Sequence, residues 1–255
     1  MGQFDAFEGT YDFEWDTDGH IPFYTGLAAE AGGPVLEFAC GTGRLLIPIA
    51  REGTEAWGVQ HPGPMAARFG RRLMDEKAEV RDLIHLVEHD PTTADLGHTF
   101  RMVFVAFAGL QLYLEEAQLG ALLDNLARHL GPGGVAAFDL IRPSESMLRN
   151  PGMLHHAWTM ERPRMRETIS RFDAMSVDAT DRRLDVTIFL DCVDETGQIS
   201  RRVVQQVMRM VEVEEIEALL AAHGLQVDGV YGSGSRAELA PSDDSMFVIA
   251  HKRQI

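Results

Sequence analysis

Short apolar runs alternate with longer amphipathic stretches between residues 35 and 140. A short apolar run is typical of a buried strand, and a longer stretch with apolar residues on one side is typical of a helix. Their alternation predicts parallel strands with helices over both faces of the sheet. The predicted strands are Val35–Ala39, Glu55–Gln60, Ile84–Glu88, Met102–Phe107 and Val135–Leu140, and the predicted helices are Arg44–Arg51, Pro64–Lys77 and Glu115–Leu130.

The pattern changes after Pro143, where apolar and polar residues alternate without intervening helices. This alternation over 166–176, 183–193 and 201–211 predicts antiparallel strands, with a turn at 194–197 between the last two. We expect a small inserted sheet that either caps the ligand-binding edge of the main sheet or forms a dimer face. The elements predicted downstream are a helix at Val213–His223 and two closing strands at Val227–Tyr231 and Ser245–His251.

The amino-terminal segment carries many aromatic residues among acids between residues 4 and 24. We interpret it as a lid, although an ordinary helix packed on the sheet edge is the alternative, and 21–31 does show helical spacing. The predicted organisation is a lid with a helix at 1–33, a core at 34–141, an inserted sheet at 142–211, and a closing helix with strands at 212–255.

A glycine turn follows the first predicted strand and leads directly into a helix. Gly41 and Gly43 allow a sharp turn and a close approach of a ligand to the backbone, and the helix behind them offers N–H groups. Glu37 stands at the end of the strand, where an acid can accept hydrogen bonds from an ammonium or hydroxyl group. The junction predicts a nucleotide-binding site, although a purely structural turn has the same appearance.

Composition limits the class of protein. The 255 residues, 45% of them hydrophobic, suffice for one large α/β core and a modest insertion. A formal net charge of −16 argues against nucleic acid or anionic membrane as a partner. Cys40 and Cys192, the two cysteines, indicate a reducing compartment rather than a disulfide framework. Without an apolar signal or membrane segment, we expect a soluble, cytoplasmic protein, either a monomer or a homodimer.

Five segments, in sequence order, carry a resemblance to a known family. They are Val35–Arg44 (Val-Leu-Glu-Phe-Ala-Cys-Gly-Thr-Gly-Arg), Gly58–Met65, Val87–Asp90, Phe100–Val105 and Leu126–Gly134. Together they resemble the motifs of class I S-adenosylmethionine (SAM)-dependent methyltransferases of the small-molecule, Methyltransferase-25-like type. The resemblance implies a Rossmann-like α/β fold with a seven-stranded sheet of order 3-2-1-4-5-7-6 and an inserted antiparallel β cap. It also implies SAM as cofactor and S-adenosylhomocysteine as product.

The same resemblance implies cofactor contacts for individual residues. Those implied are Glu37, Ala39, Gly41, Thr42 and Gly43 for the methionine end, Gln60 for the ribose, Met65, Asp90 and Pro91 for the adenine, and Ala106 at the end of the fourth strand. His61, next to Gln60, either takes over part of the ribose contact or faces the substrate. Three positions depart from the family pattern. Gln60 replaces an acid that accepts the ribose hydroxyls, Pro91 has no N–H to reach the adenine ring, and Ala108 begins a pair that is often Asn-Ser.

Three functions stay open at this point. The leading one is methyl transfer to a nitrogen, oxygen or carbon atom of a small molecule in secondary metabolism, which alignment alone can promote. The second is a methyltransferase scaffold repurposed for cyclisation or rearrangement, with SAM structural or absent, prompted by Gln60, Pro91 and Ala108. The third is a non-catalytic binding subunit.

Candidate bases for methyl transfer are Tyr11, His61, Tyr113 and His155. Tyr11-Asp12 belongs to a segment that folds over the cofactor in similar methyltransferases. We expect no metal site, because His155 and His156 would point to opposite faces if they lay in a strand, and no cluster of ligands accompanies them.

Overall fold

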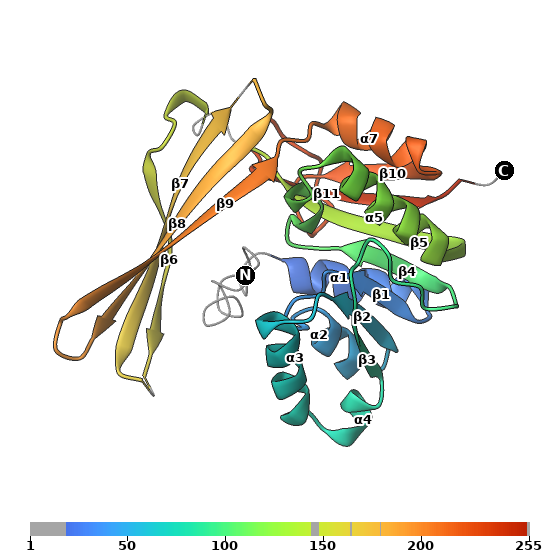
Figure 1. Cartoon of the computed structure of the whole chain (residues 1–255), viewed down its shortest axis with the longest axis horizontal. Coiled ribbons are helices and arrows are strands. Elements are labelled where there is room, and N and C mark those ends of the chain that lie inside the picture. Colours follow the sequence, from blue (N-terminus) through green and yellow to red (C-terminus); the bar gives the residue numbers. More distant parts are fainter. Residues whose placement is uncertain (1–18, 144–147, 164, 179, 254–255) are drawn as a thin grey trace. The chain divides into compact units, whose positions relative to one another are not determined.

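The computed structural model describes residues 19–143, 148–163, 165–178 and 180–253 (Figure 1). The described residues divide into two compact units, one formed by Pro143–Met210 and the other by residues 19–142 and 211–253. Residues 4–18 of the predicted lid lie outside the described residues, and residues 20–24 belong to helix α1 (His20–Ala31), as the alternative of an ordinary helix expected. No helix among the described residues is long and apolar enough to span a membrane.

The larger unit contains a seven-stranded sheet of order β10-β11-β5-β4-β1-β2-β3. Strands β1 to β5 pair in parallel, whereas β11 runs antiparallel to both β5 and β10. Because the inserted sheet contributes four strands before them, β10 and β11 are the sixth and seventh strands of the predicted order, which is confirmed. The bounds are β1 Val35–Phe38, β2 Ala56–Gln60, β3 Ile84–Glu88, β4 Phe100–Val105, β5 Leu130–Ile141, β10 Leu225–Tyr231 and β11 Ser245–Lys252.

Helices cover both faces of this sheet, as the alternation of buried side chains in β1 requires. Leu36 and Phe38 belong to the hydrophobic cluster that includes α5 and α7, whereas Val35 belongs to the cluster that includes α1, α2 and α3. The helices are α1 His20–Ala31, α2 Leu46–Arg51, α3 Pro64–Met74, α4 Ala78–Arg81, α5 Glu116–His129 and α7 Val213–Ala222, with a 3₁₀ helix η3 at Gly109–Leu112.

Several predicted boundaries were wrong, each for a local reason. The fourth strand ends at Val105 rather than Phe107, because Phe107 and Ala108 both have left-handed backbone with φ of 54°. The helix that begins at Pro64 ends at Met74 instead of Lys77, since the backbone of Lys77 is extended before α4 begins. Two further differences of two or more residues are an α2 that starts at Leu46 instead of Arg44 and a β5 that starts at Leu130 instead of Val135.

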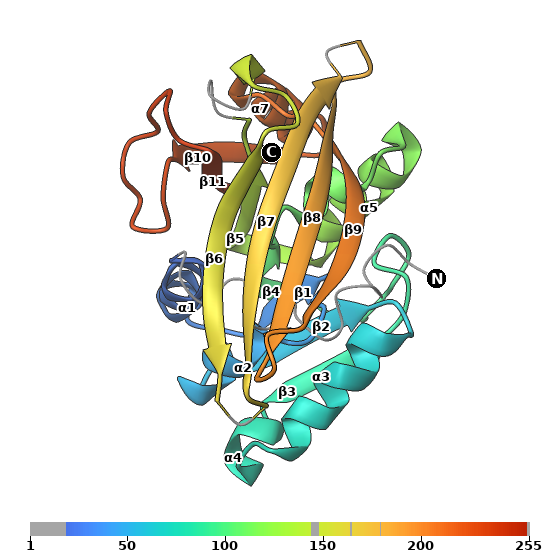
Figure 2. The same ribbon diagram turned by 90° about the vertical axis from the view of Figure 1, so that its left-hand side faces the viewer.

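The smaller unit is a four-stranded antiparallel sheet of order β6-β7-β8-β9, seen face-on in Figure 2. Three of its strands were predicted, and β6 was missed. No residue of β6 is fully buried, so its apolar signal is weak. In β8, by contrast, the buried residues Leu184, Val186 and Ile188 alternate with more exposed ones. The bounds are β6 Leu154–Arg162, β7 Glu167–Asp178, β8 Arg183–Asp194 and β9 Ile199–Arg209.

Candidate functional site

The carboxyl ends of β1 and β4 are neighbours at the point where the strand order of the main sheet reverses. From β1 the chain order continues to β2 and β3 on one side, and from β4 to β5 on the other. Ligands of open α/β sheets bind at such a point, beside the carboxyl ends of the strands. The candidate site therefore lies at the turn after β1 and the loop after β4.

The turn after β1 uses left-handed backbone at Ala39, Gly41 and Gly43, with φ of 57°, 56° and 72°. Gly43 is required by packing as well, because a Cβ atom there would lie 2.0 Å from the ring of Phe69 in α3. The predicted small residue at position 39 fits, but left-handed backbone costs an alanine roughly 1–2 kcal/mol. The turn is therefore shaped by two glycines and one strained alanine.

The buried carboxylate of Glu37 has an oxygen with no hydrogen-bond partner. Glu37 is 3% exposed, and its Oε2 finds no donor among the described residues. Burial raises the pKa of Glu37 well above its usual value, the charge of Asp139 raises it further, and Arg44 offsets part of the increase. An ammonium group of a ligand would satisfy this oxygen and stabilise the ionised carboxylate.

Gln60 at the end of β2 holds the glycine turn. The backbone N–H of Gly41 donates to its Oε1 at 2.9 Å. The amide nitrogen is then the group of Gln60 that can donate to a ribose hydroxyl. A glutamine in place of the family's acid therefore links β2 to the turn and would leave an amide donor for a ribose, with the weaker bonds of a neutral group.

Asp90, Pro91 and Thr92 form the turn after β3 predicted to meet the adenine. Asp90 Oδ1 accepts from the Thr92 backbone N–H at 2.8 Å and from its hydroxyl at 2.7 Å, and these bonds outweigh burial and lower the pKa of Asp90. The first N–H after Pro91 is thus already used by Asp90. Nε2 of His61 lies 3.9 Å from the same oxygen, so the structure brings these two predicted residues together at a half-exposed site.

The other predicted cofactor residues lie around the same edge. Met65 is buried in the first turn of α3, and Ala106 is buried directly after β4. Thr42 is fully buried, and both its hydroxyl and carbonyl oxygens accept from Arg72 Nη1 at 3.2 Å. The Thr42 hydroxyl therefore ties the turn to α3.

The candidate bases differ in their surroundings. Burial and the charge of Asp90 raise the pKa of Tyr113, so its phenol keeps its proton near neutral pH and is poorly suited as a base. His155 lies on β6 of the inserted sheet, opposite Asp173 on β7. Tyr11 lies outside the described residues. Within those residues, no group of three or more metal-ligating side chains is arranged to hold a metal ion.

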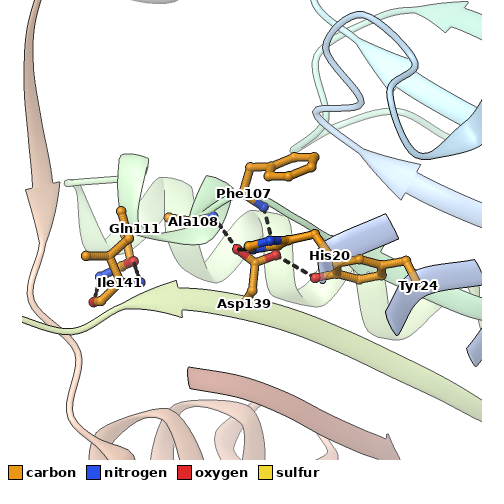
Figure 3. A network of polar contacts seen from close by, with 7 residues as sticks. All are labelled: His20, Tyr24, Phe107, Ala108, Gln111, Asp139 and Ile141. Carbon is orange, nitrogen blue, oxygen red and sulfur yellow. Dashed lines mark hydrogen bonds and ion pairs between the residues drawn. The ribbon is translucent and has the colours of Figure 1, made fainter. Parts of the chain in front are cut away.

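A buried carboxylate that sequence reasoning missed organises the loop after β4 (Figure 3). Asp139, in β5, accepts from the Tyr24 hydroxyl at 2.7 Å and pairs with His20 Nε2 at 3.3 Å. It also accepts the backbone N–H groups of Phe107 and Ala108 at 2.8 and 2.9 Å. Burial alone would raise the pKa of Asp139, but His20 and these hydrogen bonds lower it overall. The signal available in the sequence was one acid within an apolar strand.

Aromatic and cationic side chains surround the same loop. The Phe107 ring stacks on the imidazole of His20 with centroids 5.0 Å apart, and the Arg44 guanidinium lies 4.6 Å from the ring centroid. Arg44 follows the glycine turn directly. The loop after β4 and the turn after β1 are therefore in contact through Arg44 and Phe107.

Comparison with known proteins agrees with this geometry. Residues 35–134 match the protein family described as "Methyltransferase domain". The chain is 25% identical over 222 residues to the cypemycin N-terminal methyltransferase of a Streptomyces species, covering 87% of this chain and 84% of that protein.

Solved structures share the whole fold. The CcbJ methyltransferase from Streptomyces caelestis superposes with a TM-score of 0.80 at 22% identity, covering 99% of this chain and 98% of that one. The glycopeptide N-methyltransferase MtfA superposes with a TM-score of 0.62 at 25% identity, covering 94% and 92%. MtfA has also been crystallised with SAM and with sinefungin.

Residues 35–134 therefore match a methyltransferase domain, and this match, the relative and the solved structures together support a class I SAM-dependent methyltransferase, a class whose cofactor is SAM. The residues present fit this cofactor. A buried carboxylate oxygen without a donor stands beside the glycine turn, as the ammonium of the methionine end requires. Gln60 and Asp90 stand at the ends of the next two strands, where the ribose and adenine of a nucleoside would follow.

Proposed function

We propose that this chain transfers a methyl group from SAM to an amine nitrogen of a small natural product, in secondary metabolism. The observation that carries the choice of nitrogen is the pair of relatives at 25% identity. One is described by its action at an N-terminus and the other as an N-methyltransferase. The net charge of −16 supports the same choice, because a negative surface attracts ammonium compounds and repels acids.

In this proposal Glu37 holds the ammonium of the methionine end, Gln60 donates to the ribose, and Asp90 accepts from the adenine amino group. SAM supplies, when bound, an electrophilic methyl group on a sulfonium. The protein's task is to exclude water and to hold the acceptor in line with that group. Alignment of this kind can provide much of the rate enhancement without a strong base.

The acceptor nitrogen must present its lone pair, and it loses a proton once the new bond has formed. Tyr113 retains its own proton near neutral pH, and the half-exposed His61 lies beside Asp90 at the adenine end. Neither is well suited to take a proton at the methyl end. We therefore propose that the amine binds in its neutral form and releases its proton to solvent after transfer.

The test is direct. Purified chain is incubated with SAM and a panel of acceptors that present an amino sugar, a peptide amino terminus, a sugar hydroxyl or a carboxylate, and mass spectrometry detects the gain of one methyl group. Calorimetry with SAM and with S-adenosylhomocysteine is run in parallel. We expect micromolar binding of both ligands and methylation confined to amines.

Other outcomes would contradict the proposal in distinct ways. Transfer only to hydroxyl or carboxylate oxygen would contradict the choice of nitrogen. Binding of SAM with chemical conversion of an acceptor but no methyl gain would favour the repurposed scaffold. If neither ligand bound at millimolar concentration, the non-catalytic subunit would be favoured.

A further inference from the structure

The carboxylate of Asp139 binds two consecutive backbone N–H groups of a strained loop. Phe107 and Ala108 each have φ of 54°, a left-handed conformation that non-glycine residues rarely adopt and that is unusual for a bulky aromatic residue. Their N–H groups both point at Asp139, one at each carboxylate oxygen. Consecutive N–H groups that converge in this way form a binding site for an anion. Here the anion is a side chain of the protein itself.

Helix α1 holds the carboxylate from its other side. His20 and Tyr24 stand four residues apart, on one face of the helix, and both contact Asp139. All three side chains are at least 94% buried, since His20 is 6%, Tyr24 0% and Asp139 3% exposed. A neutral acceptor at position 139 would bind these donors less strongly than a carboxylate does.

The loop that Asp139 holds borders the methyl end of the candidate site. Phe107 contacts Arg44, which directly follows Gly43. The charge of Asp139 also reaches Glu37, whose pKa it raises. A change in the loop would therefore alter the alignment of the acceptor with the methyl group, and would not alter the ribose or adenine positions after β2 and β3.

We propose that Asp139, supported by His20 and Tyr24, is a positioning residue that holds Phe107 and Ala108 in left-handed backbone and thereby aligns the acceptor for methyl transfer. This inference rests on the proposed amine methylation. It assigns a role to a strained, non-glycine loop that the cofactor contacts alone do not explain.

The first test is Asp139→Asn, followed by amide hydrogen exchange of residues 107 and 108. Charge-assisted hydrogen bonds are stronger than neutral ones, so exchange at both amides should accelerate on the order of tenfold or more. Because a misplaced acceptor loses alignment, kcat for the amine should fall on the order of 100-fold. The KM for SAM should not rise, since the ribose and adenine contacts are untouched and loss of the Asp139 charge removes one cause of the raised pKa of Glu37, which favours its ionised form.

The second test adds Ala108→Gly. Glycine adopts left-handed backbone without the steric cost of an alanine, so Ala108→Gly should restore part of the lost kcat in the Asp139→Asn background and change little in the wild-type background. A general loss of stability would not be repaired in this specific way. Rescue therefore separates positioning from simple destabilisation.

The matched control is Gln111→Leu. Gln111 is also fully buried and also joins the region after β4 to β5, since it exchanges two hydrogen bonds with the backbone of Ile141, at 3.0 and 2.7 Å (Figure 3). Neither of these two hydrogen bonds involves the N–H groups of Phe107 or Ala108. We expect this variant to lose stability while exchange at residues 107 and 108 keeps its wild-type rate.

The outcomes separate this inference from the proposed function. Unchanged exchange in Asp139→Asn, or kcat within about twofold of wild type despite faster exchange, would overturn the positioning role. If Asp139→Asn does not fold, Tyr24→Phe with and without Ala108→Gly gives the same comparison with a smaller effect. If the wild-type chain binds SAM but methylates no amine, the proposed function and the alignment role both fall, while exchange still decides whether Asp139 holds the loop.

Discussion

The turn after β1 and the loop after β4 both adopt left-handed backbone, but different chemical groups stabilise it. Both place consecutive or near-consecutive residues in left-handed backbone at the ligand-binding edge of the sheet. The turn uses Gly41 and Gly43, for which that conformation is not costly. The loop uses Phe107 and Ala108, and its N–H groups bind the carboxylate of Asp139.

The two carboxylates beside these segments also differ, in how many hydrogen-bond donors the protein supplies to each. Asp139 accepts from four groups of the protein, and these contacts lower its pKa despite burial. Glu37 keeps one buried oxygen without a donor in the described part of the chain, and burial raises its pKa. The satisfied carboxylate therefore supports the fold, whereas the unsatisfied one is available to a ligand.

Gly43→Ala should produce the largest effect on the glycine side of this comparison. The added Cβ would lie 2.0 Å from the Phe69 ring, so overpacking of about 1–3 kcal/mol adds to a left-handed strain of roughly 1–2 kcal/mol. Chemical denaturation should show a loss of about 3 kcal/mol in the free energy of unfolding. The control is Gly53→Ala, which has φ of 89° but no atom within 4 Å of the added Cβ, and should show the strain alone. Equal losses would contradict the packing argument.

Glu37→Gln tests whether the unsatisfied carboxylate serves the cofactor. Loss of a charged hydrogen bond of about 1.5–3 kcal/mol should weaken SAM binding on the order of 10- to 100-fold. Because the pKa of Glu37 is raised and the ammonium binds its ionised form, wild-type affinity should increase as pH rises through that pKa, with release of a proton on binding.

Calorimetry in two buffers of different ionisation enthalpy measures this proton release. The variant should lose both the proton release and the dependence of affinity on pH. Glu79→Gln, at an exposed site in α4, is the control and should bind SAM as wild type does. A pH-independent wild type would show that Glu37 does not meet the ammonium.

Gln60→Glu should strengthen SAM binding by about tenfold, because a charged acceptor for the ribose contributes about 1.4 kcal/mol more than a neutral group. Glutamate has the length of glutamine, so one oxygen can still accept the Gly41 N–H while the other accepts a ribose hydroxyl. Gln60→Asp gains the charge but is one methylene shorter, and should gain less. Titration calorimetry of the three proteins orders them, and equal affinities would mean that residue 60 does not face the ribose.

Ala39→Gly should have the smallest effect, a gain in the free energy of unfolding of up to about 1 kcal/mol. It removes the left-handed strain at φ 57° but increases the entropy of the unfolded chain, and the two contributions partly cancel. Thermal and chemical denaturation measure the difference. The exposed helical Ala67→Gly should instead destabilise the protein by about 1 kcal/mol. A loss at position 39 would contradict the strain assigned to it.

The fold was largely predictable because each of its signals is local. The alternation of strands and helices and the glycine turn are readable within short windows, and the order of the seven strands followed from the resemblance that those windows carry. The network around Asp139 was not readable in this way. Tyr24 and Asp139 are separated by 115 positions, and the presence of one does not indicate a bond to the other. The bond between Gly41 and Gln60 escaped prediction for the same reason, whereas strand β6 was missed because its own apolar pattern is weak.

The amino-acid sequence by itself determined where the chain turns on glycine, which strands are buried, and that an acid stands beside the first turn. Only the tertiary structure decided which carboxylate the protein satisfies and which it leaves open. Local backbone preference depends on the residue and its neighbours in the chain, so it can be predicted from the sequence. The ionisation and hydrogen bonding of a buried acid depend on donors brought from distant elements, so they exist only once the sheet and its helices have packed.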